Sequence, residues 1–415
     1  MIRGLLPSLD PLSQLLLQLA TIVIAARIVG ALFARAGQPA VIGEMAAGVL
    51  LGPSLLGWMA PSAFGFVFPE SSFGTLQLLS QIGVCLFLFV VGMDVDIGHL
   101  RDKASSAVII SQSSILVPGA LGVGMAMVLY PAYAGPGATA TSFAMFMAIS
   151  MSITAFPVLA RILDERKLSS TPLGSMALTC AAANDVTAWS LLAGIVAIAG
   201  AAGWTGSLVT LAWVLLFVVV MLVVVRQLLP RWITPPASRP GVMVGALVLM
   251  LLSALTTDLI GVHALFGAFL AGAVMPRAGD VRHHLTVRIE DFSTLFLLPL
   301  FFVFTGLRTS LSLLNDAQSW LVGVFIVAIA TVGKLGGTFV AARFTGMSRP
   351  DAFALGALMN TRGLMELIAL NIGYDLGILS PRIFAMLVVM ALVTTALTGP
   401  LLTVADRWRA ALSRP

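Results

Sequence analysis

Charged residues are scarce in this chain. Asp, Glu, Lys and Arg make up 10% of its 415 residues, whereas a typical soluble domain has about 25%. Hydrophobic residues account for 59% of the sequence, and the mean hydropathy is +1.03. This composition excludes an ordinary soluble domain and predicts a polytopic membrane protein.

Cysteine is also nearly absent. Cys85 and Cys180 lie far apart in sequence, each within an apolar run. This excludes a disulfide framework, and we interpret both as small core residues. No cleavable signal is predicted, because only Arg3 precedes the first apolar segment and no clear small-residue cleavage site follows it. The last apolar segment ends near residue 405 of 415, so we expect no soluble regulatory domain.

Long apolar runs recur along the whole chain. Each is near the length at which a helix crosses a hydrocarbon core of about 30 Å. We therefore predict an all-α fold of about thirteen transmembrane helices. The predicted segments are residues 12–34, 39–57, 73–93, 104–130, 141–163, 173–199, 205–228, 240–260, 262–276, 291–307, 318–342, 351–373 and 381–405.

Basic residues in the loops predict the orientation of the chain. With thirteen segments, only Arg3, Arg308 and Arg382 fall on one side, and almost all other basic loop residues fall on the opposite side. Because cytoplasmic loops carry the Lys and Arg excess, we predict an outside N-terminus and a cytoplasmic C-terminus, in a bacterial inner membrane. The pI of 9.8 then reflects this topology and gives no support to nucleic-acid binding.

A short internal similarity indicates two repeats. Residues 86–96 and 300–310 share a Leu-Phe-rich pattern that leads to Gly92 and Gly306, at an offset of 214 residues. The second copy runs toward the opposite side of the membrane, as expected of an inverted repeat. Chance similarity between two apolar ends is the alternative. The repeat predicts three parts: residues 1–200, a linking helix at 201–239, and residues 240–415.

One carboxylate lies in the middle of an apolar segment. Asp185 falls within the run from 173 to 200, where an isolated charge costs about 3 kcal/mol or more. Small residues three or four positions away on one helical face let a backbone or an ion approach it, and Asn184 adds an amide. We predict a transport role for Asp185. A buried Asp that is hydrogen-bonded across a helix pair is the structural alternative.

Two segments look like interrupted helices. Residues 150–161 carry the hydroxyls of Ser150, Ser152 and Thr154 before the interior Pro157. Residues 358–367 read L-M-N-T-R-G-L-M-E-L, with charges at the same depth. Both have the character of discontinuous helices around a midplane site, whose unwound carbonyls bind cations. A simple proline kink is the alternative for the first segment.

Further charged residues lie at membrane depth, among them the basic residues Arg27, Lys334 and Arg362. Arg362 and Glu366 are four residues apart, so we expect them to pair on one helix face in a structural role. Lys334 lies too far from the ends of its segment to reach an interface comfortably. It therefore needs a partner, and Asn184, Asp185 and Glu366 are the candidates.

The sequence resembles the monovalent cation:proton antiporter superfamily, in the branch that holds bacterial sodium and potassium antiporters, including potassium-efflux antiporters, and the plant cation/H+ exchangers. The motifs that carry the resemblance are G-Q-P-A-V-I-G-E-M-A-A-G-V-L-L-G-P-S-L-L-G, S-I-T-A-F-P-V-L-A-R-I-L, A-A-A-N-D-V-T-A-W, G-V-H-A-L-F-G-A-F-L-A-G, P-L-F-F-V-F-T-G-L and M-N-T-R-G-L-M-E-L-I. It implies a mobile core domain with two crossing broken helices, a dimerisation domain and a homodimer. It also implies that Asp185 is the ion-binding carboxylate, Thr154 the break in the first crossing helix and Lys334 the core lysine.

We therefore predict a secondary transporter that exchanges Na+ or K+ for H+ by alternating access, with no enzymatic activity and no cofactor. Asp185 and Thr154 are the expected ligands of the transported ion, Asn184 their neighbour, and Ser152, Lys334, Arg362 and Glu366 the supporting residues. Members that exchange two protons have Asp at position 184, so Asn184 predicts electroneutral exchange. A cation channel and an intramembrane aspartyl protease are the alternatives. The sequence shows neither a filter loop nor a second carboxylate in a suitable setting.

Overall fold

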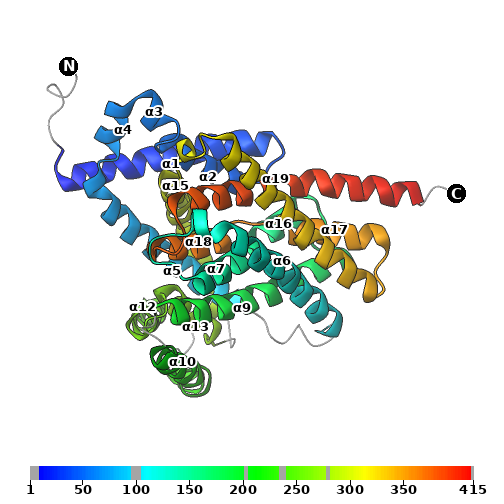
Figure 1. Cartoon of the computed structure of the whole chain (residues 1–415). Coiled ribbons are helices and arrows are strands. Elements are labelled where there is room, and N and C mark those ends of the chain that lie inside the picture. The colour runs from blue at the N-terminus through cyan, green and yellow to red at the C-terminus, as the bar shows by residue number, and fades with distance from the viewer. Residues whose placement is uncertain (1–8, 95–103, 201–203, 233–239, 277–280, 413–415) are drawn as a thin grey trace. The chain divides into compact units, whose positions relative to one another are not determined.

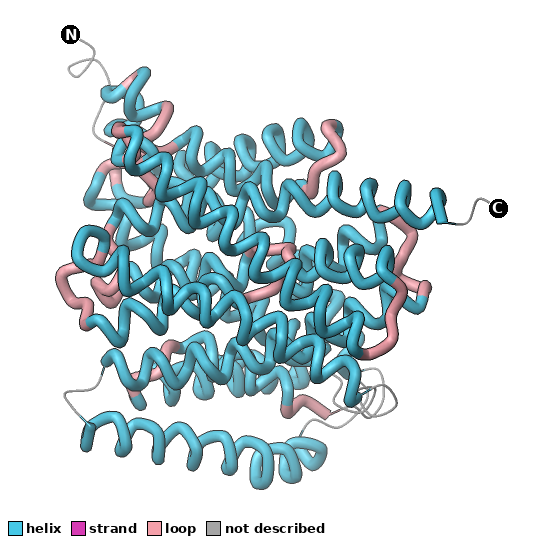
Figure 2. Tube along the Cα trace, turned by 45° about the vertical axis from the view of Figure 1, so that its right-hand side comes forward, coloured by secondary structure: helices cyan, strands magenta, loops and turns pink. Residues whose placement is uncertain are grey.

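The computed structural model describes residues 9–94, 104–200, 204–232, 240–276 and 281–412. These residues are almost entirely helical (Figure 1 and Figure 2), and the described part contains no strand beyond an isolated bridge between Ala134 and Leu379. The α-helices are α1 (Pro11–Arg35), α2 (Ala40–Leu51), α3 (Leu56–Met59), α4 (Pro61–Val67), α5 (Phe73–Asp94), α6 (Ala104–Tyr133), α7 (Ala140–Ser152), α8 (Phe156–Glu165), α9 (Pro172–Gly200), α10 (Trp204–Val219), α11 (Arg226–Trp232), α12 (Pro240–Ile260), α13 (Ala264–Ala273), α14 (Val281–Phe292), α15 (Leu298–Leu307), α16 (Ala317–Phe344), α17 (Arg349–Met359), α18 (Leu364–Asp375) and α19 (Pro381–Leu412).

The prediction of an all-α polytopic membrane protein is confirmed. Within the described residues, ten helical stretches are long and apolar enough to cross a membrane, or eleven if α17 and α18, which meet at a 42° bend, form one broken span. Two predicted segments fall outside that count. The segment 173–199 is the long helix α9, and the segment 262–276 contains the short apolar helix α13. The number thirteen therefore stays a prediction.

The chain folds into two compact units that do not follow sequence order. Unit 1 consists of residues 1–23, 65–97 and 193–304, and unit 2 of residues 24–64, 98–192 and 305–415. Each unit thus draws on both halves of the sequence. The predicted division at residues 200 and 239 concerns the repeats, which is a different partition, and it stays a prediction.

Glycine contacts within each unit give the repeat a structural basis. In unit 1, a Cβ atom at Gly92 of α5 would lie 2.1 Å from the carbonyl oxygen of Phe269 and 3.1 Å from Cα of Gly272, both on α13. In unit 2, a Cβ atom at Gly306 of α15 would lie 2.5 Å from the backbone of Gly48 on α2. Only glycine permits helices to approach so closely. The two glycines that the sequence pattern matched therefore have equivalent roles.

The partners of these glycines also repeat. Gly43–Gly48 reads G-E-M-A-A-G, and Gly267–Gly272 reads G-A-F-L-A-G, at an offset of 224 residues. The first glycine of each hexapeptide packs on the preceding long helix. A Cβ atom at Gly43 would lie 2.7 Å from Gly30 on α1, and one at Gly267 would lie 2.1 Å from the Ser253 carbonyl oxygen on α12. This regularity agrees with two related halves.

Both predicted helix interruptions are present in unit 2. Helix α7 ends at Ser152 and α8 begins at Phe156, while α17 ends at Met359 and α18 begins at Leu364. The two breaks touch, because the Ala155 N–H donates to the Thr361 carbonyl at 2.9 Å. Pro157 lies in the first turn of α8, where a missing N–H costs no helical hydrogen bond. The first segment is therefore unwound and is not a kinked continuous helix.

Candidate functional site

Asn184 on α9 fixes the first helix break. Its side-chain oxygen accepts from the Thr154 backbone N–H at 3.1 Å, and its Nδ2 donates to Oγ of Ser114 on α6, also at 3.1 Å. Both Asn184 and Ser114 are fully buried. The amide is therefore held at both ends, and it satisfies a backbone donor that the helix break leaves without an intrahelical acceptor.

Thr154 joins the two breaks. Its hydroxyl donates to the carbonyl oxygen of Met359, the last residue of α17, at 3.0 Å. A hydroxyl that donates one hydrogen bond keeps its lone pairs, so the Thr154 oxygen remains able to accept a hydrogen bond or to bind a cation. The hydroxyl oxygen of Thr154 therefore holds the two breaks together and can still act as a ligand.

Asp185 lies beside this break and is almost completely enclosed. Its side chain is 5% exposed, and the backbone N–H of Phe156, the first residue of α8, is hydrogen-bonded to its carboxyl group. A helix N-terminus favours an anion at this place. The other carboxyl oxygen, Oδ1, is buried and has no hydrogen-bond partner among the described residues. One carboxyl oxygen is thus available to a proton or a cation.

Two buried cations cover the C-terminal end of α7. The Lys334 ammonium on α16 donates to the Ser152 carbonyl. The Arg362 guanidinium donates to the Ser150 carbonyl and, at 2.8 Å, to the Met151 carbonyl. These carbonyls belong to the last turn of α7, where a helix carries its partial negative charge. The hydrogen-bond acceptor of Lys334 is therefore a backbone carbonyl, which was not among the predicted side-chain partners.

Two buried carboxylates provide counter-charges for Lys334 and Arg362. Arg362 Nη1 lies 3.2 Å from Glu366 Oε1, and both side chains are 0% exposed. Glu366 occupies the first turn of α18, where a negative charge is favoured. The charges of Glu366 and Asp185 also attract the Lys334 ammonium. The expected Arg362–Glu366 pair is present, and it lies in the loop and first turn of the second broken helix.

The supporting residue Ser152 contributes mainly its backbone. Its hydroxyl donates to the Ile115 carbonyl at 2.8 Å and to the Ala148 carbonyl at 2.7 Å, so it joins α7 to α6. Its carbonyl oxygen accepts a hydrogen bond from the Lys334 ammonium. All seven predicted site residues lie in unit 2, within residues 152–154, α9, α16, the break between α17 and α18, and the first turn of α18.

Hydroxyls on α19 form a part of the site that the sequence analysis missed. Thr395 Oγ1 lies 2.9 Å from both the backbone N–H and the carbonyl of Arg362, and Asn360 Nδ2 donates to the Thr394 carbonyl at 3.4 Å. Oγ of Thr398 lies 3.5 Å from that of Thr361. The signal in the sequence was a run of three threonines within five positions of an apolar segment. Ser114 gave a weaker signal, as one serine among several in its helix.

No protein cluster typical of a resident metal centre is present in the described residues, since no group of three or more His, Cys, Asp or Glu side chains converges there. The oxygen atoms that this region offers are the Asp185 carboxylate, the Thr154 hydroxyl and the backbone carbonyls of the helix breaks. Hard monovalent cations and protons bind such oxygen atoms. The arrangement suits a small cation that is bound and released, with one charge at its disposal.

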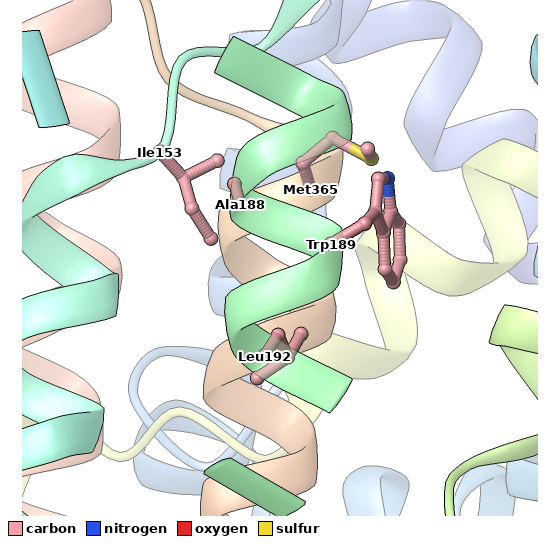
Figure 3. Close-up of a pocket in the computed structure, with 5 residues that line it drawn as sticks. All are labelled: Ile153, Ala188, Trp189, Leu192 and Met365. Carbon is pink, nitrogen blue, oxygen red and sulfur yellow. The ribbon is translucent and has the colours of Figure 1, made fainter. Parts of the chain in front are cut away.

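A small apolar cavity adjoins the site in unit 2. Its lining comprises Ile153 from the first break, Met365 from α18, and Ala188, Trp189 and Leu192 from α9 (Figure 3). The three α9 residues lie one and two turns beyond Asp185 on that helix. A dry, apolar lining offers no ligand to a charged ion. The described structure therefore gives Asp185 polar neighbours on the side of the helix breaks and an apolar border along α9.

Sequence comparisons identify relatives over almost the whole chain. The family described as sodium/hydrogen exchanger, transmembrane, matches residues 22–405. The Na(+)/H(+) antiporter NhaS4 of Synechocystis is 41% identical over 397 residues, which cover 94% of this chain and 97% of the relative. Cation/H(+) antiporter 20 of Arabidopsis thaliana is 42% identical (93% and 48% covered), and K(+)/H(+) antiporter 1 of Saccharomyces cerevisiae is 35% identical (95% and 46% covered). The chain spans about half the length of these plant and yeast relatives.

The fold has a match among solved structures as well. The sodium proton antiporter MjNhaP1 from Methanocaldococcus jannaschii aligns with a TM-score of 0.69 over 96% of this chain and 99% of its own, at 16% sequence identity. Two broken helices that touch at their interruptions, in a helical membrane protein with this match to residues 22–405, lead to one assignment. The chain belongs to the sodium/hydrogen exchanger family.

Proposed function

We propose that this protein is a monovalent cation/proton antiporter that exchanges Na+ or K+ for H+ across a membrane by alternating access. The family and the names of the relatives support exchange and speak against a channel or a protease. The single observation that carries the proposal within this chain is Asp185, a buried carboxylate with one unpartnered oxygen beside two helix breaks.

Asp185 alone serves as the competing site. When it is deprotonated it binds the cation, with help from the Thr154 hydroxyl and the carbonyls of the unwound residues. When it is protonated it is neutral and the cation leaves. Either loaded form crosses, because in both the carboxylate charge is compensated. The empty form keeps an uncompensated carboxylate, and desolvation of that charge opposes its movement.

Asn184 and Lys334 position the site in this mechanism. Asn184 orients the first break through the Thr154 N–H, and Lys334 neutralises the end of α7 through Ser152. Asn184 cannot ionise, so one carboxylate carries either one proton or one monovalent cation. The exchange is therefore electroneutral.

The remaining parts of the proposal concern placement in the membrane. The bias of the basic residues supports a cytoplasmic C-terminus and an outside N-terminus in a bacterial inner membrane. The resemblance to dimeric antiporters supports a homodimer with separate core and dimerisation domains. An aspartyl protease would need a second carboxylate at the site, whereas Asp375, at the end of α18, is paired with Arg308.

The decisive experiment compares Asp185→Asn with wild type in proteoliposomes, where proton movement is recorded after addition of Na+, K+, Li+ or Rb+. The amide keeps the shape of the side chain but neither releases a proton nor supplies a charge. We expect no exchange from this variant, at normal yield and dispersity. Asp406→Asn, which changes an exposed carboxylate on α19, is the matched control and should exchange like wild type.

Two results would contradict the proposal. Exchange retained by Asp185→Asn would remove Asp185 from the mechanism. Cation flux that is independent of the proton gradient in the wild-type protein would indicate a channel. The ranking of the four cations by their half-saturating concentrations then identifies the preferred substrate.

A further inference from the structure

A second polar cluster lies at the other end of the half-helix that carries Glu366. It consists of Thr305 in α15, Arg308 just after α15, and Asn371 and Asp375 in the last turns of α18. We call these four residues the Arg308 clamp. All of them belong to unit 2, and the chain enters unit 2 between residues 304 and 305. The clamp therefore binds the chain to α18 directly after it has passed from one unit to the other.

Each member of the clamp has a specific hydrogen bond. Arg308 Nη1 donates to Asn371 Oδ1 at 3.0 Å, and Arg308 Nη2 donates to the Asp375 carboxylate. Asn371 Nδ2 donates to Thr305 Oγ1 and to the Leu367 carbonyl, both at 2.9 Å. The guanidinium thus engages two residues one turn apart on α18, and Asn371 returns a hydrogen bond to α15. A planar fork with several donors is required for such a contact.

Burial and an aromatic contact distinguish this cluster from a surface ion pair. Thr305 is 1% exposed and Asn371 8%, and the Arg308 side chain is only 13% exposed. The Arg308 guanidinium also lies over the Tyr374 ring, 4.5 Å from its centroid, in a cation–π contact. Exposed ion pairs contribute little to stability, whereas hydrogen bonds from a buried guanidinium hold two segments in one geometry.

The turn after α18 is also held by the connection between α6 and α7. Backbone N–H groups of Gly135 and Gly137 donate to the carbonyls of Ile378 and Gly377 at 2.8 and 2.9 Å. Ser380 Oγ donates to the Tyr133 carbonyl at 2.6 Å. These bonds hold the turn after α18 against the connection between α6 and α7. The C-terminal end of α18 is therefore held in two ways: by the side chains of the Arg308 clamp and by backbone hydrogen bonds of the turn that follows the helix.

Helix α18 connects the clamp to the ion-binding region. Its first turn holds Glu366, which pairs with Arg362, and the Arg362 guanidinium in turn donates to the last turn of α7. A shift of α18 along its axis moves Glu366 and hence the end of α7, where Lys334 and the break at Thr154 lie. Arg308 thus contacts the last two turns of α18 through Asn371 and Asp375.

We propose that Arg308 is a positioning residue for cation/proton exchange. Because it holds the last turns of α18 through Asn371 and Asp375, it sets the position of the Arg362–Glu366 pair and thereby the affinity of the site for its cation. This inference rests on the proposed function. It adds a determinant of affinity that touches neither the transported ion nor Asp185.

Kinetics and binding of three variants test this role. Arg308→Gln removes the charge. Arg308→Lys keeps the charge but loses the planar fork that presents separate nitrogens to Asn371 and Asp375. Asp375→Asn weakens one contact only. Loss of a charged hydrogen bond corresponds to a factor of about ten in an equilibrium constant. We expect the half-saturating cation concentration to rise about tenfold in Arg308→Gln, with a smaller rise for Arg308→Lys and the least for Asp375→Asn. The same order should appear in the increase of Tm that Na+ or K+ gives the purified protein.

The control is Arg382→Gln, which changes an arginine in an exposed ion pair with Asp316, 3.9 Å long, in the same unit. It should show wild-type half-saturation. If wild type and Arg382→Gln do not exchange cations for protons, the proposed function fails. If they exchange and the Arg308 variants differ from them only in protein yield or maximal rate, Arg308 serves folding alone and the positioning role is wrong.

A paired substitution covers the case in which Arg308→Gln does not fold. The double variant Arg308→Asp with Asp375→Arg restores an ion pair with reversed polarity but not the bond to Asn371. Thr305→Val removes the acceptor of Asn371 at nearly constant volume. We expect partial recovery of affinity in the first, relative to Arg308→Asp alone, and a rise of half-saturation by a factor of about three to five in the second. Wild-type cation affinity in Thr305→Val and Arg308→Lys together would overturn the proposal.

Discussion

Replacement of Glu366 by Gln tests the buried charge network without any transport measurement. The Glu366 carboxylate lies 3.2 Å from Arg362, and both side chains are 0% exposed. Gln has nearly the same shape, so the change removes charge and leaves packing intact. Arg362 then keeps only the carbonyls of Ser150 and Met151 as partners, and a guanidinium charge remains buried without a counter-charge of its own.

The expected loss of stability is large. Removal of one partner of a buried ion pair costs about 3 to 5 kcal/mol, because the other charge stays desolvated. Since the amide dipole of Gln still faces the Arg362 guanidinium, we expect the lower end, about 3 kcal/mol. A change of this size lowers the midpoint of thermal unfolding by about 3 to 4 °C in a chain of this length. Removal of one partner of an exposed ion pair costs much less stability. The Arg409–Asp351 pair, with side chains 42% and 37% exposed, therefore serves as the control.

Thermal unfolding of the purified protein in detergent, followed by tryptophan fluorescence, measures both effects. Arg409→Gln should change the stability by about 1 kcal/mol or less. The double variant Glu366→Gln with Arg362→Gln should be more stable than the sum of the two single changes predicts, by at least about 1 kcal/mol. If Glu366→Gln unfolds at the wild-type temperature, the ion pair does not hold the second break, and the reasoning on the network is refuted.

Three further predictions follow from the same geometry. Thr154→Ala should retain measurable exchange at reduced cation affinity, in contrast to Asp185→Asn, because the backbone carbonyls at the break survive; loss as complete as in Asp185→Asn would make the hydroxyl a principal ligand. Exchange in proteoliposomes should not respond to an imposed membrane potential, although a net charge moved across 100 mV would gain about 2.3 kcal/mol; a rate or end-point that follows the potential would make Lys334 a second proton carrier. Gly272→Ala should lower the thermal stability, because its Cβ would meet the Phe89 carbonyl oxygen at 2.0 Å, whereas Gly245→Ala, where no atom lies within 4 Å, should be neutral or stabilising; equal effects of the two changes would contradict the close contact.

Much of the site could be predicted from the sequence because its chemistry is local. Asp185 is conspicuous as a charge in an apolar run, and the spacing of Arg362 and Glu366 gives their ion pair directly. The breaks were visible from Thr154, Pro157 and the polar run around 360. These signals need only the residues of one segment.

The remaining contacts could not be predicted because they depend on where backbone groups become free. Lys334 was expected to meet a side chain, but it donates its hydrogen bond to the Ser152 carbonyl, which is available because α7 ends there. Ser114 and Thr395 act through hydrogen bonds to groups 70 and 33 residues away. The count of thirteen segments rests on apolar length, which does not distinguish a spanning helix from a short buried one such as α13.

The glycine contacts have a consequence for the origin of the chain. Gly48 meets Gly306, and Gly272 meets Gly92, so each half contributes the hexapeptide glycine to one contact and the lone glycine to the other. Two copies of a single half-length polypeptide, inserted in opposite orientations, would form both contacts at once through the same pair of positions. Such an interface is isologous, because residue i of one copy meets residue j of the other and the reverse. The two contacts are therefore what the predicted inverted repeat expects of two related halves, because each contact is the counterpart of the other when the halves are exchanged.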